Sequence, residues 1–248
     1  MIELRGVSLS LGGQIIFEDA DFRAGFQERI AVLGKSGSGK TTLLKLILGL
    51  IPPDKGDIYI DGQRINGLKE SEMVGPRMNF SIVFQHGALF DSMNVLENVA
   101  FCMRERSNLS DDEIERRAVQ LLRSLDIEGA RYLMPEDLSG GMQRRVAIAR
   151  AWADCQPKMM LYDEPTTALD PATANQILAL VDDIADKRDS GNIGFIMVTH
   201  EVGHAAKVSR RFLFLKDGKF KFDGPLDALK ASNDPELREF VAEISQGE

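Results

Sequence analysis

The chain has 248 residues, 44% of them hydrophobic and 27% charged, and a formal net charge of −8. These proportions are those of a globular protein, and the densest basic spots are two arginine pairs, 144–145 and 210–211, which are too short for a nucleic-acid or anionic-lipid surface. The apolar stretches have strand length, not the ~20 residues of a membrane-spanning helix, and no secretory signal opens the chain. We expect no nucleic-acid partner, and any work at a membrane must go through a protein.

The N-terminal part has the pattern of antiparallel strands. Residues 1–11 and 15–22 alternate apolar and polar side chains on either side of Gly12-Gly13, which predicts two strands joined by a turn. Residues 29–33 form an apolar run that predicts a buried strand. After a glycine-rich loop, a helix is expected over 42–50, before Pro52-Pro53.

The middle of the chain has helical patterns. The sequence from Ser110 to Glu113 predicts a capping box, and apolar residues follow at helical spacing. A helix is expected over 143–152, and buried strands return at 158–163 and 193–199. This alternation of strands and helices predicts an α/β fold with a mainly parallel sheet.

A last helix is expected from Asp234 to about Gln246, because Asp234-Pro235 fits a cap followed by proline in the first turn. It has an apolar stripe that must be buried. Two interpretations stay open: the stripe packs on its own domain, or it docks a neighbouring chain. The stripe consists of Leu237, Phe240, Val241 and Ile244.

A phosphate-binding loop is the first chemical motif. Residues 34–41 fit the G-x-x-x-x-G-K-[ST] pattern between a strand and a helix. Glycines let successive backbone N–H groups point at phosphates, Lys40 would reach the β/γ-phosphates, and the Thr41 hydroxyl would bind Mg²⁺. Lys35 is interpreted as a solvated side chain. The expected nucleotide-binding residues are Gly34, Ser36, Gly37, Ser38, Gly39, Lys40, Thr41 and Thr42.

Two acids end the apolar strand at 158–163. An apolar strand that delivers a carboxylate beside a phosphate loop is how P-loop ATPases hold Mg²⁺, and Asp163 is the expected metal ligand. Glu164, one residue further, would orient and deprotonate the attacking water.

A second glycine turn, Leu138-Ser139-Gly140-Gly141-Met142-Gln143, opens a helix and forms a further anion site. Together with the two motifs above, it resembles the signature of the ABC ATPase family. The resemblance implies further roles: Gln85 as the Q-loop residue and a Mg²⁺ ligand, Asp170 as the D-loop acid, and His200 as the switch histidine. In that family the signature turn, here Ser139, Gly140 and Gly141, closes on the nucleotide of a second subunit, which implies a head-to-tail dimer.

The segment 84–95 is similar to the ATPases of the Mla/Mce lipid-transport type, as are 132–135 and 233–235. This resemblance implies a phospholipid or other hydrophobic cargo, an integral-membrane permease, possible contact with a small cytosolic regulatory subunit, and a place on the cytoplasmic face of the inner membrane. In the family this region lines the groove for the permease, although core packing would equally explain Leu89, Phe90 and Met93. The alternative is an ABC ATPase of another import, export or membrane-signalling complex.

The resemblance implies P-loop NTPase (RecA-like) topology, with ATP and Mg²⁺ as ligands. We expect an ATP-binding core with an antiparallel β subdomain over 1–87 and 156–224, a helical signature subdomain inserted at 88–155, and a C-terminal helical tail over 225–248. One departure concerns Leu11, which stands where the family usually has an aromatic residue that stacks on adenine. Leu11 would contact the base without a π-face, so the preference for ATP over GTP is open.

A rival motif is present at 200–204, where His-Glu-Val-Gly-His fits the zinc-peptidase pattern. Two histidines on one helix can share a metal, so His200 and His204 define a zinc metallopeptidase as the remote alternative. The motif follows a predicted strand directly, however, and Gly203 weakens a helix within it. The ATPase interpretation is therefore preferred.

Overall fold

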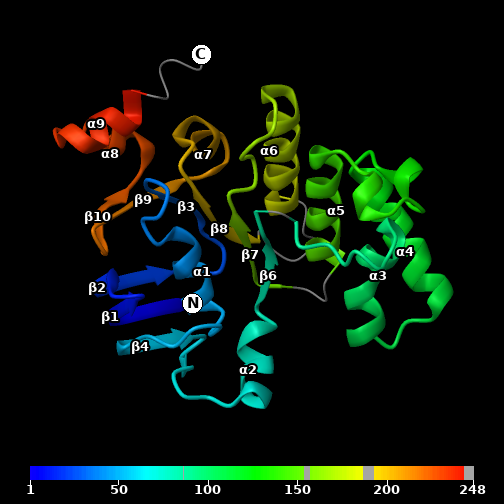
Figure 1. The fold of residues 1–248 in the computed structure, drawn as a ribbon, viewed down its shortest axis with the longest axis horizontal. Helices are drawn as coiled ribbons and strands as arrows, with labels where there is room; N and C mark the ends of the chain where they lie inside the picture. The colour runs from blue at the N-terminus through cyan, green and yellow to red at the C-terminus, as the bar shows by residue number, and fades with distance from the viewer. Residues whose placement is uncertain (86, 154–156, 187–192, 243–248) are drawn as a thin grey trace.

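The structure is a computed structural model that describes residues 1–85, 87–153, 157–186 and 193–242, and the strands of this part of the chain form two sheets (Figure 1). The larger sheet has the strand order β10–β9–β3–β8–β7–β6. All of its described pairings are parallel except β10 with β9, so the prediction of a mainly parallel sheet is confirmed. Its strands are β3 (Arg29–Leu33), β6 (Phe80–Val83), β7 (Met159–Asp163), β8 (Gly194–Thr199), β9 (Arg211–Lys216) and β10 (Lys219–Gly224).

The smaller sheet is antiparallel, with the order β2–β1–β4–β5. The predicted pair at the N-terminus is confirmed, with Leu11 opposite Gln14. Gly12 and Gly13 of the turn have φ of 58° and 84°, the left-handed region that suits glycine. Its strands are β1 (Ile2–Leu11), β2 (Gln14–Ala24), β4 (Lys55–Ile60) and β5 (Gln63–Arg64).

The helices cover the sheets and form a lobe at one side (Figure 1). In the part of the chain that the structure describes, none of them has both the length and the apolar character needed to cross a bilayer. They are α1 (Lys40–Ile47), α2 (Glu70–Arg77), α3 (Val95–Arg106), α4 (Asp111–Ser124), α5 (Gly140–Ala153), α6 (Pro171–Asp186), α7 (Val202–Val208), α8 (Leu226–Lys230) and α9 (Pro235–Ala242), with 3₁₀ turns η1 (Glu128–Ala130) and η2 (Pro135–Asp137).

Two helix boundaries differ from the prediction because of local caps. The helix expected over 42–50 is α1, which starts at Lys40 directly from the phosphate loop and ends before Gly49, whose φ is 61°. The helix expected over 143–152 is α5, which starts at Gly140 because Ser139 Oγ accepts a hydrogen bond from the Met142 N–H at 3.3 Å.

The predicted capping box at the start of α4 is wrong in one half. Ser110 Oγ accepts a hydrogen bond from the Glu113 N–H at 3.3 Å, as a cap does. The Glu113 carboxylate does not return the bond to Ser110, because it pairs with Arg116 and Arg117 on the next turn of the helix. A reciprocal box occurs instead at the start of α3, between Asn94 and Glu97.

Helix α5 has two buried faces that join the helical lobe to the parallel sheet. Val146 and Ala149 belong to an apolar cluster with α3 and α4. Ala147, Ile148 and Ala151 belong to a second cluster with β6, β7, β8 and α6. The lobe is therefore packed directly against the core that ends in the candidate site.

The C-terminal helix α9 packs on its own chain. Leu237 is 3% exposed and lies in a cluster with Leu33, Phe214 and Leu229. Val241 is partly buried against the same cluster. The rest of the predicted stripe, the side chain of Phe240 and residue Ile244, lies outside the described residues. The contacts of Leu237 support self-packing.

We therefore predict that Leu237→Ala lowers the free energy of unfolding by about 2–5 kcal/mol, since it removes buried methyl groups and leaves a cavity. Chemical denaturation of the isolated protein would measure this loss. Glu239→Ala, on an exposed position of the same helix, is the control and should change stability by less than about 0.5 kcal/mol. Equal stability of the Leu237 variant and wild type would mean that α9 does not stabilise the domain.

Candidate functional site

The candidate site lies where three neighbouring parallel strands end. In the pairing of β3 with β8, Leu33 lies opposite Thr199. In the pairing of β7 with β8, Asp163 lies opposite Val198. The carboxyl ends of parallel strands meet at one edge of a sheet, so the loop after β3, Glu164 after β7 and His200 after β8 come together there.

Lys40 is the central cation of this edge. It is 5% exposed, and its Nζ donates to the backbone oxygens of Gly34 at 2.9 Å and Lys35 at 3.1 Å. The same Nζ lies 3.3 Å from Glu164 Oε1. Gly39 allows the loop to place Lys40 here. Its φ is 100°, and a Cβ at this position would come within 2.8 Å of Ile16 Cγ2, so glycine is required.

Thr41 and Asp163 form a pair of oxygen ligands. The Thr41 hydroxyl donates to Asp163 Oδ1 at 2.9 Å, across from the first turn of α1 to the end of β7. Burial raises the pKa of the Asp163 carboxyl above its usual value, and the bond from Thr41 works against that shift. A hydroxyl and a carboxylate at this distance are hard oxygen ligands of the kind that Mg²⁺ prefers.

Glu164 is held in place from several sides. Its φ is 48°, which is uncommon for a non-glycine residue and typical of strained functional positions. Its Oε2 accepts from Thr167 Oγ1 at 3.0 Å and lies 2.9 Å from His200 Nδ1. Burial alone would raise the pKa of this carboxyl, but the bond with His200 and the charge of Lys40 outweigh it and place the pKa below its usual value.

A cavity of about 580 Å³ opens over these groups. Six of the eight predicted loop residues line it, with Gln85, Glu164 and His200, whereas Gly34, Ser38 and Asp163 do not. Lys35, which was interpreted as a solvated side chain, also lines it, as do two residues that the sequence reasoning missed, Ile16 and Thr167. A polar residue three positions after the acid was a usable signal for Thr167, whereas Ile16 is brought in by the packing of β2 on the loop. The lining is Ile16, Lys35, Ser36, Gly37, Gly39, Lys40, Thr41, Thr42, Gln85, Glu164, Thr167 and His200.

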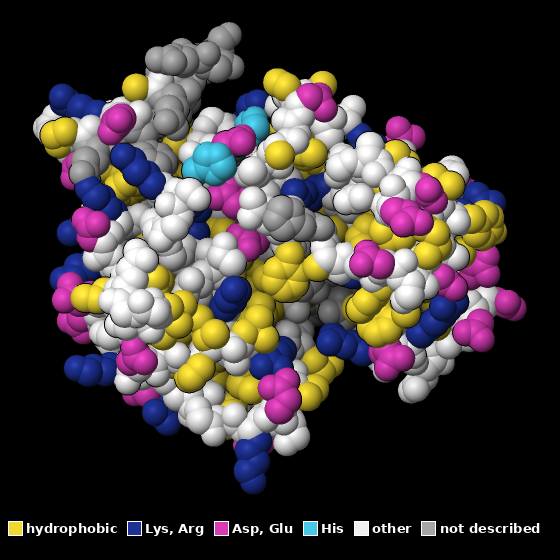
Figure 2. All heavy atoms as spheres, viewed as in Figure 1, with side chains coloured by type: hydrophobic (Ala, Val, Ile, Leu, Met, Phe, Trp, Pro, Cys, Tyr) yellow, Lys and Arg dark blue, Asp and Glu magenta, His cyan; other side chains and the backbone are white. Residues whose placement is uncertain are grey.

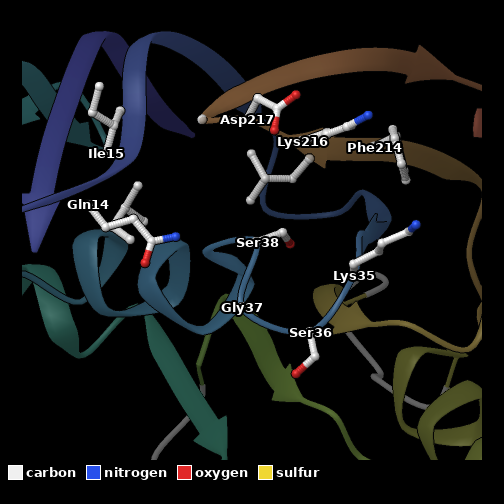
Figure 3. A pocket seen from close by; sticks show the side chains of 12 residues that line it. Gln14, Ile15, Lys35, Ser36, Gly37, Ser38, Phe214, Lys216 and Asp217 are labelled. Atoms are coloured by element: carbon white, nitrogen blue, oxygen red, sulfur yellow. The ribbon is translucent and has the colours of Figure 1, made fainter.

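A second cavity of about 260 Å³ lies on the other side of the same loop (Figure 3). Residues 14–16 of β2, residues 35–38 of the loop and residues 214–218 of the β9–β10 hairpin line it. Ser38 Oγ is buried and has no hydrogen-bond partner among the described residues. Leu11 lines neither cavity and is 46% exposed, so its contact with a base stays a prediction.

The glycine turn before α5 lies apart from the first cavity. Ser139, Gly140, Gly141 and Asp170 are absent from its lining. Asp170 instead caps α6, because it accepts from the backbone N–H and the hydroxyl of Thr173 at 3.0 and 2.5 Å. Thr173 also faces the turn, since a Cβ on Gly141 would come within 2.7 Å of Thr173 Cγ2.

The two histidines of the zinc-peptidase pattern have separate partners. His200 precedes α7 and contacts Glu164, whereas His204 lies on α7 and its Nδ1 contacts Glu201 and, at 3.0 Å, Thr166 Oγ1. Within the described ranges, which leave out His86, no group of three His, Cys, Asp or Glu side chains could hold a metal ion. The arrangement favours a phosphate-handling site over a peptidase.

Comparison with known proteins points to one family. The sequence model described as ABC transporter matches residues 17–167. The intermembrane phospholipid transport system ATP-binding protein MlaF of Escherichia coli is 35% identical over 100% of this chain and 90% of that protein. The glutamine transport ATP-binding protein GlnQ of the same species is 37% identical over 99% of this chain and 100% of that protein.

A solved structure has the same fold. The ATP-binding cassette MJ0796, in a dimeric post-hydrolysis state bound to ADP and Pi, superposes with a TM-score of 0.81 at 32% identity, over 91% of this chain and 99% of that one. The predicted fold class, an α/β P-loop NTPase with an antiparallel β subdomain and a helical subdomain, is confirmed.

The close approach at Gly141 gives a prediction for this turn. Gly141→Ala should destabilise the protein by about 1–3 kcal/mol, since the added methyl group overlaps the Thr173 methyl group. Gly140→Ala is the matched control, because nothing lies within 4 Å of the place that a Cβ on Gly140 would take.

The double variant Gly141→Ala/Thr173→Ser should recover most of that loss, because serine keeps the hydroxyl that donates to the Asp170 carboxylate and removes the methyl group. Chemical denaturation of wild type, Gly141→Ala, Thr173→Ser and the double variant measures all terms of the cycle, and Gly140→Ala is measured beside them. Equal stability of the Gly140 and Gly141 variants would contradict the packing described.

Proposed function

The chain belongs to the ABC transporter family, and we propose that it hydrolyses ATP to move phospholipid, or another hydrophobic compound, between membranes. It is an ATPase coupled to transport, and its ligands are ATP and Mg²⁺. The observation that carries the proposal is the meeting of Lys40, Thr41, Glu164 and His200 in one cavity, with Asp163 bonded to Thr41 behind it.

We assign the chemistry to the groups of this cavity. Lys40 and the loop N–H groups hold the phosphates, as a helix N-terminus after a glycine-rich loop favours. Glu164 accepts the proton of the attacking water, and its depressed pKa keeps it ionised at neutral pH. His200 orients Glu164 and steadies the γ-phosphate, and Gln85 completes the wall of the cavity.

The residues present fit a magnesium ion. Thr41 and Asp163 already place a hydroxyl and a carboxylate oxygen 2.9 Å apart, and Gln85 lines the same cavity. These three residues would hold the ion, which neutralises charge that develops on the phosphate oxygens.

The active unit is a homodimer, as in the dimeric cassette that shares this fold. We propose a head-to-tail arrangement in which Ser139, Gly140 and Gly141 face the nucleotide of the other subunit. Their position at the start of α5, a helix of 14 residues, gives them the N–H groups and partial charge that anions prefer.

The membrane partner would dock on the helical lobe. Three large apolar side chains are exposed there, at 39% for Phe90, 64% for Tyr132 and 41% for Leu133. All three are tied to the first half of α3. Its first N–H groups donate to the backbone oxygens of Arg131 and Leu133, and the Phe90 N–H donates to Asn98 Oδ1 at 2.8 Å. Figure 2 shows apolar side chains gathered on this lobe and beside it. We propose that a permease binds here, on the cytoplasmic face of the inner membrane.

A small cytosolic regulatory subunit remains part of this proposal. The self-packing of Leu237 leaves the exposed side of α9 for such a partner.

The cargo is the finer part of the proposal. Percentage identity does not decide it, because MlaF and GlnQ are similarly close at 35% and 37%. The resemblance of the segment 84–95 to the Mla/Mce type supports lipid as the cargo.

Substitution of the general base tests the enzyme assignment. Glu164→Gln should bind ATP, accumulate as an ATP-bound dimer, and turn over roughly 10²–10⁴-fold more slowly, because the water loses its base. Steady-state ATPase assays and size-exclusion chromatography with ATP measure both effects. Glu201→Gln, a nearby acid outside the cavity lining, is the control and should keep most of the turnover. Nearly wild-type turnover in the Glu164 variant would contradict the assignment of Glu164 as the general base.

A test of the cargo requires the complete transporter. We expect the complex isolated from native membranes to carry phospholipid, as mass spectrometry of extracted lipids would show. Its ATPase rate should rise on reconstitution in phospholipid. Stimulation by glutamine or another polar solute, with no lipid retained, would instead place the chain with the solute importers.

A further inference from the structure

Arg144 is a buried cation without an acidic partner. It lies on the first turns of α5 and is 7% exposed. Its Nη1 donates to the backbone oxygen of Phe84 at 2.9 Å, and among the residues that the structure describes no carboxylate forms an ion pair with it. A buried charge is costly unless it is paired. Burial lowers the pKa of this guanidinium, and the more distant Asp163 charge opposes the shift, so part of the cost remains uncompensated.

The side chain faces a cavity of about 200 Å³, the Arg144 pocket. The pocket adjoins the nucleotide cavity, because Gln85 and Thr167 line both. Gly140, at the amino end of α5, lies on its wall, and its described lining contains no aspartate or glutamate. Guanidinium donors, two amides, a hydroxyl and a helix N-terminus thus surround a space whose described lining has no negative side chain, which is the environment of an anion site.

We propose that the Arg144 pocket binds inorganic phosphate, the second product of ATP hydrolysis, next to the place where it forms. The inference rests on the ATPase assignment, since the neighbouring cavity must supply the phosphate. The volume suits a phosphate with a few waters, each of which occupies about 30 Å³ in the liquid. The guanidinium offers the fork that matches two phosphate oxygens, and the bound anion compensates the buried charge.

A structural role for Arg144 is the competing explanation, because its bond to Phe84 also ties α5 to the loop that contains Gln85. Arg150 provides a matched control for that role. It lies on the same helix and donates to the backbone oxygens of Gly87 at 3.0 Å and Ala88 at 2.7 Å, in the same loop. Arg150 does not line the Arg144 pocket, so its loss removes a tether and leaves the pocket intact.

The test measures binding of radiolabelled inorganic phosphate to the ADP- and Mg²⁺-saturated protein by equilibrium dialysis. Arg144→Gln should weaken phosphate affinity at least about tenfold, because a charge-assisted bidentate contact is lost. Phosphate should also inhibit the variant's ATPase activity less. Arg150→Gln should bind phosphate within about twofold of wild type. Equal affinities in wild type and Arg144→Gln, or equal losses in both variants, would overturn the proposal.

A second variant and a turnover measurement ensure that each outcome supports or contradicts the proposal. If Arg144→Gln does not fold, Arg144→Lys replaces it: lysine keeps the charge without the fork, so a clear partial loss of affinity supports the pocket and an unchanged affinity overturns it. Wild-type ATP turnover is measured in the same preparation. Turnover with unchanged phosphate binding in the Arg144 variant defeats this inference alone, whereas absence of ATP binding and turnover defeats the proposed function as well.

Discussion

Parallel pairing of β3, β8 and β7 is the constraint on which the site depends. The three strands end at nearly the same level, so groups that follow them in the chain become neighbours although Lys40 and His200 are 160 positions apart. A slip of one residue would turn the last side chains of β7 to the opposite face of the sheet.

The same edge concentrates charge in a poorly solvated place. Lys40, Asp163 and Glu164 are all buried. The charges of Lys40 and Glu164 balance each other, and contacts with Thr41, Thr167 and His200 further stabilise the two carboxylates. A buried ionic group is costly unless its partners and hydrogen bonds are in place. The cluster is therefore held in place by its own hydrogen bonds and ion pair.

Much of this arrangement was predictable because the rules involved are local. A strand, a glycine loop and a helix in sequence define the phosphate loop. The apolar strands that end in Asp163 and precede His200 predict which residues lie at the carboxyl edge of the sheet. The missed features depend on tertiary packing. Glu113 caps less than predicted because Arg116 and Arg117 compete for it, and Ile16 joins the cavity through the fold of β2 against the loop. The spacing of Thr167 three positions after Glu164 was a usable signal for their bond, but no local pattern predicts the left-handed backbone of Glu164.

The two buried faces of α5 bear on how the chain unfolds. A lobe with its own separate hydrophobic core could unfold as an independent unit, as many peripheral elements do. Melting of this lobe would also strip Ala147, Ile148 and Ala151 from the sheet, so its opening exposes apolar area on both sides of one helix. The lobe and the parallel core are consequently expected to unfold together, as one cooperative unit.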